Sequence, residues 1–102
     1  MSSEISVEVF KSRVQDLGGF SSVKFSPHMR FRAGQRRLDW GKIKEELESG
    51  NIEDVEFNGN PNESIPFQEA YIIFLSVQGE LITVLFYILE DGSMKAVTVM
   101  RE

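Results

Sequence analysis

The chain of 102 residues contains no cysteine and a single histidine, His28. Without cysteine it can build neither a disulfide framework nor a thiolate nucleophile. A structural zinc site, usually built from four Cys and His ligands, is not expected either. We therefore expect neither a metal nor a cofactor in this protein.

Long hydrophobic runs are also missing. The longest, residues 81–89 and 71–75, fall well short of the roughly 20 residues that span a bilayer. The first ten residues include acids where a signal peptide would have basic residues and a continuous apolar segment. The expectation is a cytoplasmic protein without a membrane partner.

Charge, in contrast, is abundant and unevenly distributed. The net charge is −5, yet residues 24–44 carry seven Lys or Arg against one acidic residue, a net of +6. Residues 1–23 have a net charge of −1, and residues 45–102 have a net charge of −10. Such asymmetry in an acidic chain predicts a local anionic partner rather than general adhesion to nucleic acid.

Hydrophobic periodicity predicts a single α+β domain. Apolar spacings of three and four residues predict a helix over 5–17. A basic helix is predicted to follow Pro27 over about 28–35, and a third helix over 39–49, with Asp39 as its N-cap and a stop signal at 49–51. The predicted strands are residues 22–25, 52–57, 67–77, 80–89 and 94–100. Short turns between the last three predict an antiparallel β-meander, covered on one face by helices.

The N-terminal segment is expected to be an addition to this domain. Residues 1–21 are predicted to form a helical extension, and residues 22–102 the α+β domain itself, all within one compact unit. The helix has an apolar stripe of Val7, Phe10, Val14 and Leu17. We expect this stripe to pack on the domain, although it could instead bind a partner or form a homodimer. Tyr71 and Tyr87, in apolar strands, are predicted core residues with hydroxyls at an edge.

The segment HMRFRAGQRR, residues 28–37, carries the candidate site. On a helix, His28, Arg32 and Arg36 span about 80° of arc, and Gln35, which stands between Arg32 and Arg36 in the sequence, projects from the same side. Like charges at this spacing repel by a few tenths of a kcal/mol per pair, so the arrangement favours a negative ligand opposite. Arginine binds phosphoryl oxygens through two parallel hydrogen bonds, and imidazole can transfer a proton near neutral pH.

This pattern predicts a metal-independent site for RNA or another phosphate-bearing ligand. In a catalytic version His28 is the general acid or base, while Arg32 and Arg36 hold the scissile phosphate. Arg32, Gln35 and Arg36 are the predicted ligand-binding residues.

Two other interpretations stay open. The twelve carboxylates of residues 45–102 could neutralise the arginines within the fold, and His28 could simply be a helix-start residue. Alternatively, the basic helix docks an acidic protein or a nucleic acid without chemistry, as a module of a regulatory pair. In that case binding depends on Arg32 but not on His28.

The stretch SPHMRFRAGQRRLDWGKIKEELESGNI resembles the opening of a family of small uncharacterised proteins with the RelE/ParE toxin-like fold. That family has a histidine and two arginines, each separated by three residues, then Gly-Ile, a capping residue and a second helix. His28, Arg32 and Arg36 match the basic positions, Leu38 the isoleucine and Asp39 the cap.

The resemblance covers residues 22–102, including the closing strand AVTVMRE. It implies a RelE-like fold, RNA cleavage and a cognate antitoxin as partner. Arg37 departs from the usual glycine, and Thr83 stands where relatives often carry another histidine. The chain is also acidic overall, whereas RNA-cleaving toxins of this fold are usually basic.

Overall fold

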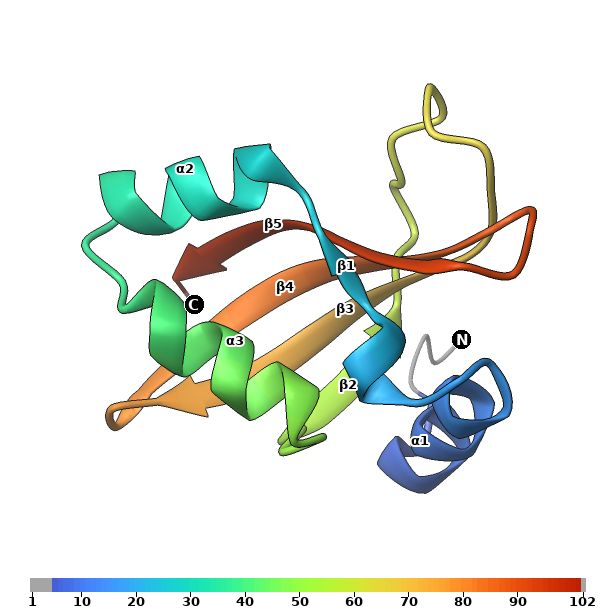
Figure 1. Cartoon of the computed structure of the whole chain (residues 1–102), viewed down its shortest axis with the longest axis horizontal. Helices are drawn as coiled ribbons and strands as arrows, with labels where there is room; N and C mark the ends of the chain where they lie inside the picture. The colour runs from blue at the N-terminus through green and yellow to red at the C-terminus, as the bar shows by residue number, and fades with distance from the viewer. Residues whose placement is uncertain (1–4, 102) are drawn as a thin grey trace.

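The computed structural model describes residues 5–101. The helices and strands within them are α1 Val7–Asp16, a 3₁₀ turn Phe20–Ser22, β1 Lys24–Phe25, α2 Pro27–Gln35, α3 Trp40–Glu48, β2 Asp54–Phe57, β3 Phe67–Val77, β4 Glu80–Leu89 and β5 Met94–Arg101. The strands form one sheet in the order β1-β5-β4-β3-β2 (Figure 1). The described chain is therefore an α+β protein with three α-helices, as predicted.

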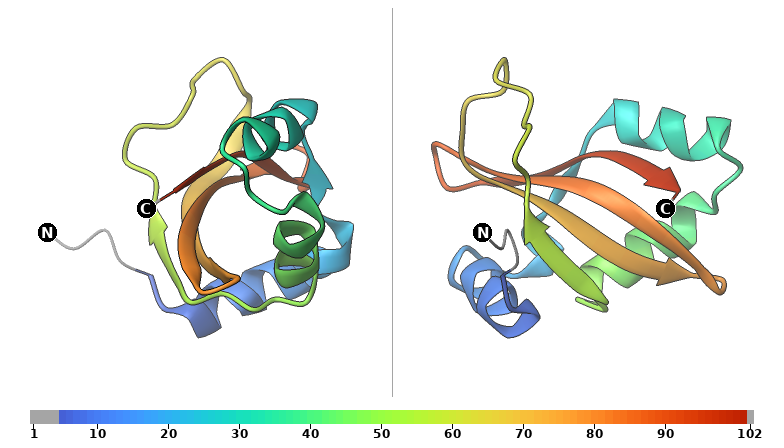
Figure 2. Two further views of the ribbon diagram at one scale, coloured as in Figure 1. Left: turned by 90° about the vertical axis from the view of Figure 1, so that its left-hand side faces the viewer. Right: turned by 180° about the vertical axis from the view of Figure 1, so that it is seen from behind.

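All three helices lie against the concave face of the curved sheet (Figure 2). The core lies between these two layers. Its fully buried residues include Val14 of α1, Met29 and Ala33 of α2, Ile43 and Leu47 of α3, and Ile73, Leu75, Ile82, Val84 and Ile88 of the sheet. No helix within residues 5–101 is both long and apolar enough to cross a membrane.

The sheet is mixed, which corrects the expectation of a purely antiparallel one. The predicted meander β3-β4-β5 is antiparallel, and so is the pairing of β2 with β3. β1, however, runs parallel to β5, with Phe25 opposite Ala96. This pairing joins residues some seventy positions apart in the chain. A strand of two residues has no hydrophobic pattern from which its direction could be predicted.

The turn between β3 and β4 contains two residues in the left-handed region. Gln78 has φ 53° and Gly79 has φ 80°. Positive φ at both central residues is typical of a type I′ turn, whose twist matches that of the flanking strands. The predicted short hairpin is thus confirmed.

Both tyrosines are core residues, as predicted. Tyr71 is 2% exposed and Tyr87 1% exposed. The Tyr87 hydroxyl accepts a hydrogen bond of 2.9 Å from the Asn62 amide and so ties the loop after β2 to the sheet. The Tyr71 hydroxyl donates to the Glu69 carboxylate.

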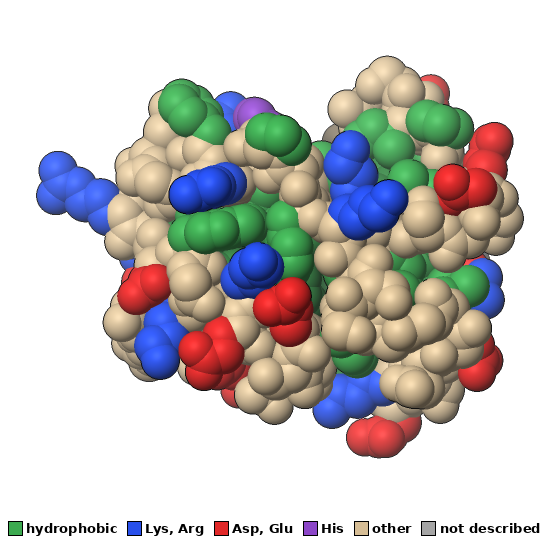
Figure 3. Space-filling model, viewed as in Figure 1, with side chains coloured by type: hydrophobic (Ala, Val, Ile, Leu, Met, Phe, Trp, Pro, Cys, Tyr) green, Lys and Arg blue, Asp and Glu red, His purple; other side chains and the backbone are tan. Residues whose placement is uncertain are grey.

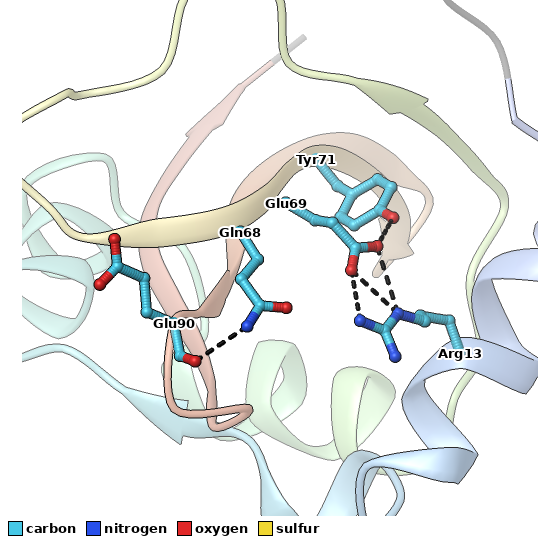
Figure 4. A network of polar contacts seen from close by, with 5 residues as sticks. All are labelled: Arg13, Gln68, Glu69, Tyr71 and Glu90. Carbon is cyan, nitrogen blue, oxygen red and sulfur yellow. Dashed lines mark hydrogen bonds and ion pairs between the residues drawn. The ribbon is translucent and has the colours of Figure 1, made fainter.

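α1 is attached to the sheet by an aromatic contact and an ion pair. The fully buried Phe10 ring packs edge-on against Tyr71, with centroids 5.0 Å apart, and also contacts Phe86. Arg13 Nε donates to Glu69 Oε2 at 2.9 Å, so Glu69 accepts from both Arg13 and Tyr71 (Figure 4). The predicted packing of the N-terminal stripe on the domain is confirmed.

This network shifts the pKa values of the Glu69 carboxyl and the Tyr71 hydroxyl. The hydrogen bond from Arg13 holds the pKa of Glu69 below its ordinary value, in opposition to the desolvation that would raise it. Burial raises the pKa of the Tyr71 hydroxyl, and the hydrogen bond to Glu69 raises it further. Arg13 therefore forms a structural ion pair, which helps to hold α1 on the sheet.

Candidate functional site on helix α2

Helix α2 is fixed to strand β5 at its first residue. Ser26, its N-cap, accepts a hydrogen bond from the Met29 amide at 3.0 Å. The same hydroxyl donates to the Val97 carbonyl, and the Ser26 amide donates to the Ala96 carbonyl. Pro27 then occupies a first-turn position, where its missing N–H would have had no helical partner. The start of the basic helix is therefore held rigidly against the sheet.

Helix α2 ends one residue before Arg36, the last of the three basic residues that were predicted to share one side of a helix. α2 stops at Gln35, and Arg36 is its C-cap. Arg37 adopts φ 56°, its amide donates to Gly34, and the Leu38 amide donates to Ala33. These two bonds form a Schellman motif, in which the left-handed position is usually glycine. Arg37 therefore stands at the position where the resemblance expected glycine.

The structure brings three of the four predicted site residues together. Arg32 Nε lies 3.4 Å from His28 Nε2 and is oriented to donate to it. Arg32 Nη1 donates to Gln35 Oε1 at 3.2 Å. His28 and Gln35 are exposed, and Arg32 is half-buried. The three side chains form a polar row along one flank of α2.

Arg36 follows this row as the C-cap of α2, and its amide still donates to the Arg32 carbonyl at 3.0 Å. Its carbonyl accepts a hydrogen bond from Arg101 Nη2 of β5. In the part of the chain that the structure describes, no hydrogen bond joins the Arg36 side chain to His28 or Arg32. The functional roles predicted for all four residues remain predictions.

The arginines of α2 lack carboxylate partners among residues 5–101. The ion pairs found there are Arg13–Glu69, Lys42–Glu45 and Arg101–Glu80. Two acids of the C-terminal half are thus paired with cations outside residues 24–44, and the third pair is local to α3. Within this described range, the fold does not neutralise Arg30, Arg32, Arg36 or Arg37 by ion pairing.

α2 also exposes an aromatic ring that the sequence analysis overlooked. Phe31 is 63% exposed, the largest value among the exposed large hydrophobic residues of the described chain. It lies about 180° around the helix from the buried Met29 and Ala33, between Arg30 and Arg32. A helical wheel centred on Met29 and Ala33 could have identified it as an apolar residue on the solvent side.

The surface around α2 is correspondingly basic. In the view of Figure 3, Lys and Arg side chains lie over α2 and between α2 and α3, with hydrophobic side chains between them, and acidic side chains lie over α3. No group of three metal-binding side chains was found among residues 5–101. Chemically, the surface offers guanidinium groups, one imidazole and an exposed ring, a combination suited to an extended anionic ligand.

Comparison with other proteins adds no further constraint. No protein-family model matches the chain, and neither a curated protein nor a solved structure matches it. The resemblance to the RelE/ParE toxin-like fold thus rests on the residues quoted above.

Proposed function

We propose that this protein binds single-stranded RNA through the basic helix α2, with Arg32 and Gln35 on the phosphate backbone and His28 beside them. One observation carries the proposal. The cations of α2 have no carboxylate partner among the described residues, whereas Arg13 and Arg101 do. An arginine without a carboxylate partner keeps its positive charge available to a ligand, and a guanidinium group suits phosphoryl oxygens.

The exposed ring of Phe31 favours RNA over a simple anion. Proteins that bind single strands combine basic side chains with aromatic rings on which bases stack. Phe31 lies on the same helix as Arg32 and is exposed. Arg37, just after the end of this helix, has a charged side chain on a backbone in the left-handed conformation. That conformation costs a non-glycine residue free energy, so folding stability alone does not account for an arginine there.

A salt titration with a short labelled RNA tests this function. The acidic remainder of the chain limits binding to few phosphates, so we expect two or three contacts. Log affinity should then fall against log salt concentration with a slope of roughly −1.4 to −2. Arg32→Gln should weaken binding and reduce the magnitude of the slope by roughly 0.7, the value for one contact on a single strand.

Lys11→Gln is the matched control, because it removes one positive charge from α1. It should leave both affinity and slope nearly unchanged. Equal weakening by the two variants would show that net charge, rather than α2, governs binding. Absence of any salt-sensitive binding would contradict the proposed function.

A second candidate, RNA cleavage, is favoured by the contact between Arg32 and His28. Arg32 Nε lies 3.4 Å from His28 Nε2, so an imidazole, which can act as a general acid or base, lies beside the group proposed to hold the phosphate. RNA incubated with the wild type should then be cut, with or without added ribosomes, and His28→Ala should abolish cutting while binding persists. Intact RNA under both conditions would leave a non-catalytic binding module.

A further inference from the structure

A second basic surface lies on the opposite flank of α2 from the row of His28, Arg32 and Gln35. It is a groove between the start of α2 and helix α3. Its lining residues are Phe25, Ser26, Pro27, Arg30, Trp40 and Lys44. About 160° of helical arc separates Arg30 from Arg32, so the two flanks are distinct. In Figure 3 this region has basic side chains around hydrophobic ones.

Two aromatic rings make the apolar part of the groove. Phe25 and Trp40 pack edge to face, with ring centroids 5.4 Å apart and an interplanar angle of 85°. Both are half-buried. Phe25 is positioned by the pairing of β1 with β5, and Trp40 by the capped first turn of α3. Each ring is therefore held by regular structure while part of it remains accessible.

Two cations flank these rings. Arg30 and Lys44 are exposed, and neither has an ion-pair partner within residues 5–101. Lys44 Nζ lies 5.9 Å from the centroid of the Phe25 ring. No acidic residue is among those that line the groove. A ligand that fits must combine a flat apolar part with negative charge, and a nucleotide has both.

We propose, on the basis of the function proposed above, that this groove holds one nucleotide of the bound RNA strand. Its base stacks on the Trp40 ring, to which Phe25 lies edge-on, and Arg30 and Lys44 bind the adjoining phosphate. The strand then crosses the outer side of α2 at Phe31 and reaches Arg32 on the other flank. Stacking is tolerant of base identity, since every base presents a π face, so recognition here is by chemical class rather than by sequence.

Tryptophan fluorescence tests the stacking directly, because Trp40 is the only tryptophan of the chain. The full chain is titrated with a short oligouridylate and, separately, with inorganic polyphosphate. The oligouridylate should quench Trp40 emission in a saturable, salt-sensitive manner. Polyphosphate should compete for the same protein with little change in emission, because it offers phosphates and no base.

Variants measured by anisotropy of the labelled oligouridylate separate the contributions. Trp40→Leu should weaken binding about tenfold or more, in line with the loss of one stacked base, while Trp40→Phe should retain most of the affinity. Arg30→Gln and Lys44→Gln should each weaken binding. Phe57→Leu, which alters a 47% exposed ring on β2, is the matched control and should have no effect. Circular dichroism of each variant separates lost binding from lost folding.

The outcomes distinguish this inference from the function on which it rests. Oligouridylate that binds without changing Trp40 emission, together with a Trp40→Leu variant of unchanged affinity, would overturn the groove and leave RNA binding by the Arg32 flank. No binding of either probe would overturn both. Uridine monophosphate or polyglutamate binding as tightly as the oligouridylate would identify a free nucleotide or an acidic protein as the ligand, and would overturn the assignment to RNA.

Discussion

Helices α1 and α2 have ten and nine residues and lie on the same face of the sheet, yet they use similar side chains in opposite ways. On α1, Phe10 is fully buried and Arg13 is bound to Glu69. On α2, Phe31 is 63% exposed, and Arg32 has no carboxylate partner among residues 5–101. The comparison separates residues that hold the fold together from residues that the fold leaves available to a ligand.

The largest expected difference is between the two phenylalanines. Phe10→Ala should lower the free energy of unfolding by about 3–5 kcal/mol, because it opens a cavity between α1 and the rings of Tyr71 and Phe86. Phe31→Ala should change it by less than about 0.5 kcal/mol, since the ring is mostly in water. Urea denaturation of both variants measures this. Equal losses of unfolding free energy in the two variants would mean that the Phe31 ring is not exposed to solvent.

Removing the carboxylate that holds Arg13 should have a smaller effect. Glu69→Ala leaves the buried Tyr71 hydroxyl without its hydrogen-bond acceptor, which should cost about 1–3 kcal/mol of unfolding free energy. RNA affinity should be unaffected, because α1 lies outside the proposed binding surface. Glu53→Ala, which removes an exposed acid from the loop before β2, serves as control and should cost less than about 0.5 kcal/mol. A comparable loss in both would contradict the structural role of Glu69.

The same network predicts a pH dependence. The pKa of Glu69 is lower in the folded state than its ordinary value of 4.5, because Arg13 donates to it. Below pH 4.5 the unfolded chain therefore binds more protons at this residue than the folded chain, and stability falls as pH drops toward the folded pKa.

Urea denaturation between pH 6 and pH 2 should show this loss, and Glu69→Gln should flatten the curve. Some slope should remain in that variant, because the hydrogen bond from the Ser93 hydroxyl also lowers the pKa of Asp91. If the stability of Glu69→Gln depended on pH as steeply as that of the wild type, Glu69 would not be paired with Arg13 in solution.

The smallest expected effect is a gain. Arg37→Gly should raise the free energy of unfolding by about 1 kcal/mol, since glycine adopts φ 56° without the steric cost of a side chain. The same variant should weaken RNA binding if Arg37 contributes to the basic surface. Gln78 is the other residue that has a positive φ but is not glycine. Gln78→Gly should therefore raise the free energy of unfolding by a similar amount without changing the affinity for RNA. A destabilised Arg37→Gly would show that the arginine contributes to the fold.

Much of the fold could be predicted from local patterns. The bounds of β3 and β4 agree with the prediction residue for residue, because turn residues and continuous apolar runs delimit them. α3 begins directly after Asp39, its predicted cap. The direction of β1 could not be predicted, since its partner β5 is distant in the chain and the strand has only two residues.

The candidate site was predictable in part. The four-residue spacing of His28 and Arg32 and the position of Gln35 were sufficient to place their side chains together, because helical geometry fixes which residues are neighbours. Arg36 is the C-cap of the helix rather than part of it, and its predicted role stays a prediction. The exposure of Phe31 could have been predicted from its position on the helical wheel, opposite Met29 and Ala33. No pattern in the sequence predicted the groove that contains Trp40 and Arg30.

The sequence by itself determined the helices, the long strands, the meander and the excess of positive charge in residues 24–44, because each depends on side chains close together in the chain. Only the tertiary structure decided which cations of the chain are paired with carboxylates across the fold. Arg13 meets Glu69 across fifty-six residues of chain, and Arg101 meets Glu80 across twenty-one. It also decided that Phe25 and Trp40 form one groove, since their contact requires β1 to pair with β5 while α3 packs beside it. Ion pairs and grooves of this kind depend on distances in space, which composition and periodicity do not specify.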